Sequence, residues 1–183
     1  MAVAKTVWGF IENRDHRVMR RLNSWSAPRW IRFWMLTATR MGDGWLWYSL
    51  GALLLAFGGP RGYSAFGSAG TAAILGILVF KALKRLSHRP RPCQFQPHCW
   101  AEVLPPDQFS FPSGHTMTAF SIALVVSYFY PSLEAPLFFL ALSIAVSRVV
   151  LGMHFLSDVL AGAVLGVALG CASITTFASF GLA

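Results

Sequence analysis

The sequence predicts an all-α fold, a polytopic membrane helix bundle of about five spanning helices with an N-terminal amphipathic interfacial segment. Hydrophobic residues make up 55% of the 183 positions and charged residues only 12%, whereas soluble domains carry roughly 25% charged residues. Residues 44–60, 62–80 and 159–183 contain no charge at all, and roughly 20 apolar residues in a helix cross a bilayer. Lipid is therefore the predicted solvent for most of the surface.

The predicted organisation is an interfacial segment, residues 1–43, followed by a membrane-embedded domain, residues 44–183. Eight Lys or Arg residues alternate with tryptophans in the first segment, which has no apolar run of signal-peptide type. Mixed basic and aromatic residues are typical of amphipathic helices at the headgroup level. The net charge of +8 fits attraction to anionic lipid. Because a bilayer leaves little surface for nucleic acid, we expect the lipid bilayer as a partner and no nucleic acid.

Five apolar stretches are the predicted spans, near residues 44–59, 63–83, 115–130, 136–152 and 157–179. Helix breakers separate them, since Gly58, Gly59 and Pro60 follow the first stretch and Pro131 and Pro136 flank the turn after the third. The third and fourth stretches are short for a bilayer, a length that suits helices lining a polar cavity.

Residues 84–114 form the longest predicted loop, and their six prolines favour irregular backbone. Cys93 and Cys99 lie in this loop beside two histidines, but their spacing matches no familiar zinc pattern. A local disulfide or free thiols are favoured over a metal site, and we expect no metal and no cofactor. Cys171, in the last apolar stretch, is expected to be a buried small hydrophobe.

Three polar clusters interrupt the apolar sequence, and the last contains His154 and Asp158. Four residues apart on a helix, the two side chains share one face. A carboxylate bonded to one imidazole nitrogen fixes the tautomer and leaves the other nitrogen free to attack. Arg148 precedes them, with Gly152 allowing a turn between. The alternative is a pair that only satisfies its own hydrogen bonds inside a bundle.

The second cluster predicts the start of a helix. Pro112, Ser113 and Gly114 precede an apolar run, so Ser113 is the predicted N-cap. The free backbone N–H groups at such a helix start suit an anion. His115, in the first turn, would face that anion and protonate a leaving oxygen. An ordinary capped helix with an exposed histidine is the alternative.

The first cluster supplies positive charge at the end of the second span. Lys84 and Arg91 are the predicted phosphate ligands, Arg91 through bidentate hydrogen bonds and Lys84 as a point charge. Arg89 lies between them in the sequence. Lys81 and Arg85 are interpreted as a basic interfacial anchor.

The clusters read Lys-x6-Arg-Pro, Pro-Ser-Gly-His and Ser-Arg-x5-His-x3-Asp in that order, and so resemble the signature of the phosphatidic acid phosphatase type 2 superfamily. The resemblance runs from Lys84 to Asp158 without departure. It implies that His154 attacks phosphorus and becomes a phosphohistidine, that Asp158 orients it, and that His115 protonates the leaving group. The residues that it implies for binding the phosphoryl oxygens are Lys84, Arg91, Ser113, Gly114 and Arg148.

The resemblance also implies a metal-independent enzyme acting on a membrane lipid phosphate, with its active site on the extracytoplasmic side of the bacterial inner membrane. The basic first segment should lie on the same face and would favour the cytoplasm. The short chain is most similar to undecaprenyl-diphosphate phosphatases. Phosphatidylglycerophosphate, phosphatidic acid and lipid A 1-phosphate are alternative substrates. Vanadium haloperoxidases share the signature but are large and soluble, and a non-catalytic transport or lipid-binding protein would not need the intact triad.

Overall fold

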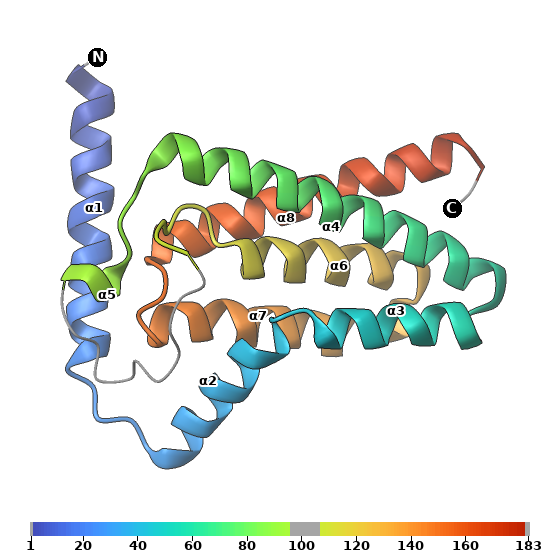
Figure 1. Ribbon diagram of the computed structural model, residues 1–183, viewed down its shortest axis with the longest axis horizontal. Coiled ribbons are helices and arrows are strands. Elements are labelled where there is room, and N and C mark those ends of the chain that lie inside the picture. Colours follow the sequence, from blue (N-terminus) through green and yellow to red (C-terminus); the bar gives the residue numbers. More distant parts are fainter. Residues whose placement is uncertain (1, 96–106, 182–183) are drawn as a thin grey trace.

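The computed structural model describes residues 2–95 and 107–181, which fold into α-helices and short connections without any β-sheet (Figure 1). The all-α fold class is confirmed. The helices are α1 (Ala2–Asn23), α2 (Arg29–Met41), α3 (Trp45–Phe57), α4 (Gly59–Ser87), α5 (Pro92–Phe95), α6 (Gly114–Phe129), α7 (Glu134–Val150) and α8 (Leu156–Ser179), with a 3-10 turn at Pro131–Leu133.

Helices α3, α4, α6, α7 and α8 occupy the places of the five predicted spans. Three segments are long and apolar enough to cross a membrane, namely α4, α8 and α7 with the turn before it, whereas α3 and α6 are apolar but shorter. Helix α4 is longer than predicted, so Lys84 lies on a helix and not in a loop. It ends where His88 adopts a left-handed conformation with φ of 46°, just before Pro90, which cannot continue a helix.

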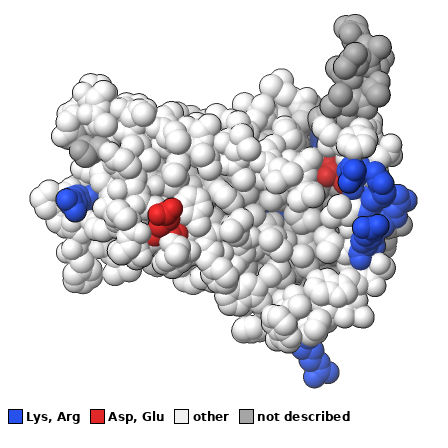
Figure 2. Space-filling model, turned by 180° about the vertical axis from the view of Figure 1, so that it is seen from behind, with Lys and Arg blue, Asp and Glu red and all other residues white. Residues whose placement is uncertain are grey.

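Helix α6 lies at the centre of the bundle, in contact with α4, α7 and α8, while α3 packs on α4 (Figure 1). Helix α1 crosses one end of the bundle and contacts α7 and α8. A wide uncharged band separates that end, where the basic side chains gather, from a few charges at the other end (Figure 2). This distribution is the one expected of a multi-pass membrane protein.

The first segment packs on the bundle. Met35 of α2 is buried in a cluster with Val150 at the end of α7 and with Leu151 and Met153 in the connection to α8. Aromatic side chains of α2 remain exposed, including Trp30 and Phe33. Helical structure in this segment agrees with the sequence, and its position at the membrane interface remains a prediction.

Two predictions about cysteines have different outcomes. Cys171 is exposed and not buried, because it lies on the face of α8 that points away from the rest of the bundle. Cys93 has no disulfide partner among the described residues, and because Cys99 lies outside them the predicted disulfide or free thiols stay a prediction.

Helix α8 approaches α6 so closely that their backbones touch. A Cβ atom on Gly166 would lie 2.4 Å from the carbonyl oxygen of Met117, and one on Gly162 would lie 2.6 Å from that of Ser113. Small residues at membrane helix contacts allow this kind of approach. The glycines on this face of α8 therefore set the distance between the two helices.

Replacing Gly166 by Ala should separate α8 from α6, since the added methyl group meets backbone that cannot turn away. We expect a loss of about 1–3 kcal/mol, typical of overpacking, measured as a lower melting temperature in detergent. Gly70→Ala on α4 is the matched control, because a Cβ atom there meets nothing within 4 Å. Equal melting temperatures for the two variants would contradict this account of the packing.

Candidate active site

A cavity of about 450 Å³ lies between α4, the start of α6 and the connection from α2 to α3. Its lining combines side chains from all three polar clusters with two acidic residues. The charged residues and histidines of the lining are Asp43, Lys84, Arg91, Asp107, His115, Arg148 and His154. Gly114 also lines it, whereas Ser113 and Asp158 do not. Six of the eight residues singled out in the sequence thus share one cavity.

Three cations of the cavity are buried: Lys84 is 8% exposed, Arg91 1% and Arg148 2%. Arg148 donates a hydrogen bond of 2.5 Å from Nη1 to the hydroxyl of Thr39 on α2. Its Nε has no hydrogen-bond partner among the residues that the structure describes. Because buried donors are nearly always satisfied, this free donor beside two further cations indicates a site for an anion.

The carboxylate of Asp107 occupies part of this cationic site. Its Oδ2 lies 2.6 Å from Lys84 Nζ, and its Oδ1 lies 2.7 Å from Arg91 Nη2. Burial opposes its ionisation, but the hydrogen bonds from Lys84 and Arg91 outweigh that effect and lower the pKa of Asp107. An internal anion thus holds two of the three cations.

His154 lies in the turn between α7 and α8, where its backbone N–H donates to the carbonyl oxygen of Arg148 (3.0 Å). Gly152 permits the turn with φ of +67°. The Nδ1 of His154 lies 2.6 Å from the carbonyl oxygen of Ser110, and Nε2 lies 3.2 Å from Arg91 Nη1. Since a carbonyl only accepts, Nδ1 carries the proton, and Nε2 keeps its lone pair at the cations.

The imidazole of His154 is held in its neutral form. Burial lowers its pKa well below the ordinary value, and the positive charges of Arg91, Arg148 and Lys84 lower it further. A neutral ring with an unprotonated Nε2 is the nucleophilic state of histidine.

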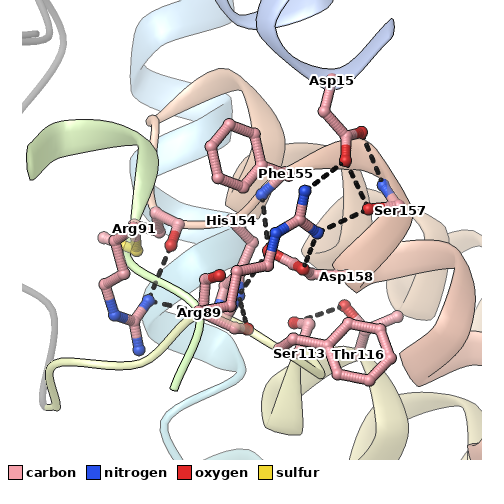
Figure 3. A network of polar contacts seen from close by, with 12 residues as sticks. Asp15, Arg89, Arg91, Ser113, Thr116, His154, Phe155, Ser157 and Asp158 are labelled. Carbon is pink, nitrogen blue, oxygen red and sulfur yellow. Dashed lines mark hydrogen bonds and ion pairs between the residues drawn. The ribbon is translucent and has the colours of Figure 1, made fainter. Parts of the chain in front are cut away.

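Asp158 stands behind His154 at 0% exposure (Figure 3). The predicted hydrogen bond between the two is not formed: His154 Nδ1 and Asp158 Oδ2 are 3.8 Å apart. Oδ2 accepts the backbone N–H of Phe155 at 2.9 Å, and Oδ1 accepts Nη1 of Arg89 at 2.6 Å. The carbonyl of Ser110 takes the place on Nδ1 that the sequence assigned to the carboxylate.

The second cluster begins α6 as predicted, with Ser113 at the N-cap position. Its side chain does not cap the backbone, however, because its hydroxyl pairs with that of Thr116 at 2.9 Å. Gly114 allows close packing, since a Cβ atom there would lie 3.2 Å from the ring of Phe80. His115 is not a freely exposed histidine: its Nε2 lies 2.8 Å from Oδ1 of Asp43.

Sequence reasoning missed several polar partners of these residues. They are Thr39, Asp43, Asp107 and Ser110, together with Arg89, which bonds Asp158, and Asp15, which bonds Arg89. The acidic members had a detectable signal. The chain has only seven Asp and Glu residues, and uncompensated cations are rare in a membrane bundle. Each acid was therefore a candidate partner for a basic cluster. Among the described residues no group of three His, Cys, Asp or Glu is arranged to hold a metal ion.

Comparison with known proteins places this geometry in a family. Residues 65–181 match the PAP2 superfamily. Decaprenylphosphoryl-5-phosphoribose phosphatase of Mycobacterium tuberculosis is 35% identical over 127 residues, which cover 69% of this chain and 68% of the relative.

Two solved structures share the fold. The crystal structure of Aquifex aeolicus LpxE has a TM-score of 0.73 at 28% identity, covering 87% of this chain and 93% of that one. The first transmembrane PAP2 type phosphatidylglycerolphosphate phosphatase from Bacillus subtilis has a TM-score of 0.71 at 25% identity, covering 92% and 87%. The chain therefore belongs to the PAP2 superfamily and is a membrane lipid phosphatase.

Proposed function

We propose that the chain cleaves the phosphate ester or diphosphate of a membrane lipid through a phosphohistidine at His154, without a metal ion. The observation that carries this proposal is the orientation of His154. Its Nδ1 is tied to Ser110, so Nε2 faces the cationic end of the cavity. Phosphoryl transfer needs an in-line nucleophile and positive charge around the equatorial oxygens.

In the proposed reaction Nε2 of His154 forms a bond to the terminal phosphorus while the bond from that phosphorus to the leaving oxygen breaks; this oxygen is the ester oxygen of a lipid monophosphate or the bridging oxygen of a diphosphate. Lys84, Arg91 and Arg148 neutralise the charge on the phosphoryl oxygens, and Ser113 and Gly114 contribute the start of α6. The leaving oxygen takes a proton from His115, which Asp43 supports at 2.8 Å. Water then attacks phosphorus and gives a proton back to His115, the bond from phosphorus to Nε2 breaks, and phosphate leaves.

The remaining wall of the cavity supports a lipid substrate. It is apolar and aromatic, formed by Trp47 and Tyr48 of α3, Ile77 and Phe80 of α4, and Ile122 of α6. Tyr48 and Ile77 are also exposed on the outer surface. A chain attached to the phosphate therefore has an apolar path from the cations to the lipid side of the bundle.

Undecaprenyl diphosphate, converted to undecaprenyl phosphate, is the substrate that we propose. The relative from Mycobacterium is named for a decaprenyl-linked phosphate, which favours a polyprenyl chain. Phosphatidylglycerophosphate is the second candidate, favoured by the name of the structure from Bacillus. Phosphatidic acid and lipid A 1-phosphate complete the set to be compared.

Replacing His154 by Ala should reduce phosphate release on the order of 10³-fold or more, because a lost nucleophile removes the covalent step. Purified protein is assayed in EDTA with each of the four lipids, and a phosphoenzyme is sought after rapid quenching. His88→Asn is the matched control, since His88 is exposed and Asn accepts its left-handed backbone. Equal phosphate release by the Ala variant and the native chain, or activity only with added metal, rules out this scheme.

Asp107 supplies a second test, because its carboxylate competes with phosphate for Lys84 and Arg91. In Asp107→Asn we expect inorganic phosphate to inhibit at a concentration lower on the order of tenfold, which corresponds to about 1.4 kcal/mol. Glu134→Gln, which changes an exposed carboxylate at the far end of the bundle, is the control. Weaker phosphate binding in Asp107→Asn would show that the carboxylate builds the site and does not compete for it.

We propose that the active site faces the extracytoplasmic side of the bacterial inner membrane, although the basic first segment favours the opposite orientation. Exposed Glu12 lies on α1 at the site end, and exposed Ser132 lies in the turn before α7 at the other. In a chain whose native cysteines are Ser, Glu12→Cys should react with an impermeant maleimide on intact spheroplasts. Ser132→Cys should react only after permeabilisation, and the reverse pattern would place the site in the cytoplasm.

A further inference from the structure

Arg89 connects helix α1 to the carboxylate behind His154 (Figure 3). Its Nη1 donates to Asp158 Oδ1 at 2.6 Å and to the hydroxyl of Ser157 at 2.7 Å. Its Nη2 donates to Oδ2 of Asp15, on α1, at 2.7 Å. The guanidinium also stacks over the ring of Phe155, with its central carbon 4.4 Å from the ring centre.

Asp15 is built into this end of the bundle. Its residue is only 4% exposed, and its Oδ1 accepts the backbone N–H of Ser157 at 3.1 Å. The hydroxyl of Ser157 donates to its Oδ2. A carboxylate buried on an otherwise amphipathic helix needs such partners, and here every one of these partners adjoins Asp158.

The backbone of Arg89 reaches His154 by a second route. Its carbonyl oxygen accepts the N–H of Ser110 at 2.8 Å. The carbonyl oxygen of Ser110 in turn accepts Nδ1 of His154 at 2.6 Å. Arg89 is therefore one residue away from both groups that face Nδ1 of the imidazole.

The charges of this cluster add up to a specific effect. Arg89 carries one positive charge between two carboxylates, Asp15 and Asp158, so the ionised trio has one negative charge in excess. That charge lies on the side of His154 opposite Lys84, Arg91 and Arg148. If Asp15 were neutral, the positive charge of Arg89 would offset the charge of Asp158 more fully, and less negative charge would face the imidazole.

We propose that Asp15 and Arg89 are positioning residues for the nucleophile, which makes helix α1 a part of the active site. Asp15 shares the charge of Arg89, and Asp158 keeps negative charge for the positive imidazole ring that forms on attack. This inference rests on the proposed role of His154. It assigns the first segment a function in the chemical step, in addition to any role at the membrane surface.

In Asp15→Asn, kcat should fall by about 10- to 100-fold, the range typical of groups one contact behind a reacting histidine. KM and inhibition by inorganic phosphate should stay unchanged, because the three cations are not touched. Glu12→Gln is the matched control, an exposed carboxylate on the same helix. Arg89→Gln should also lower kcat, because Asp158 loses the hydrogen bond that fixes its carboxylate, and Arg85→Gln, at an exposed position of α4, should not.

A purely structural role of Asp15 predicts a different pattern. If Asp15 only fastens α1 to the bundle, Asp15→Asn lowers the melting temperature and the folded fraction, but kcat per folded molecule equals that of the native chain. Ser157→Ala loses one hydrogen bond to Asp15 and one from Arg89, but it changes no charge and keeps the backbone N–H that reaches Asp15. It should therefore lower kcat less than Asp15→Asn does.

A measurement that does not need turnover tests the same link from Asp15 through Arg89 to His154. In protein labelled with 15N-histidine, the signal of His154 is the one that His154→Ala removes, and Asp15→Asn should shift it while Glu12→Gln should not. An unshifted signal, or a native kcat in Asp15→Asn, overturns the proposal that Asp15 helps to position His154. Absence of lipid turnover in the native chain would refute the proposed function, and the 15N signal would still decide whether Asp15 acts on His154.

Discussion

The contact between the backbones of α6 and α8 fixes His115, at the start of α6, relative to Asp158, at the start of α8. Without side chains at Gly162 and Gly166, α8 lies directly on the first turns of α6. At the N-terminal ends of the two helices the N–H of Ser113 donates to the carbonyl oxygen of Asp158 at 3.0 Å. The start of one helix is thereby fixed against the start of the other, and His115 and Asp158 are brought to the same end of the bundle.

Charge in an apolar bundle is the second constraint. Buried ions are stable only when they are paired and hydrogen-bonded, and the chain uses four of its seven acids at this end. Asp107 holds Lys84 and Arg91, Asp43 holds His115, and Asp158 shares Arg89 with Asp15. Positive charge therefore gathers on the Nε2 side of His154, and negative charge lies behind it.

The first segment contributes more than an anchor. Thr39 of α2 bonds Arg148, Asp43 follows α2 and bonds His115, and Asp15 of α1 bonds Arg89. Each side chain partners a residue of a signature cluster or its neighbour. The predicted division at residue 43 describes a change in composition, but the polar contacts of Asp15, Thr39 and Asp43 cross it.

The sequence by itself determined the helical class, the places of the five apolar helices and the three polar clusters, because hydropathy and local spacing record them. Tertiary structure decided which atoms meet. Ser110, and not Asp158, bonds Nδ1 of His154, and Ser113 bonds Thr116 and not its helix backbone. The contact of Ser110 with His154 joins residues 44 positions apart, and it depends on how closely the helices pack. No local pattern encodes such distances, so residues such as Asp15 and Arg89 acquire their partners only when the bundle closes.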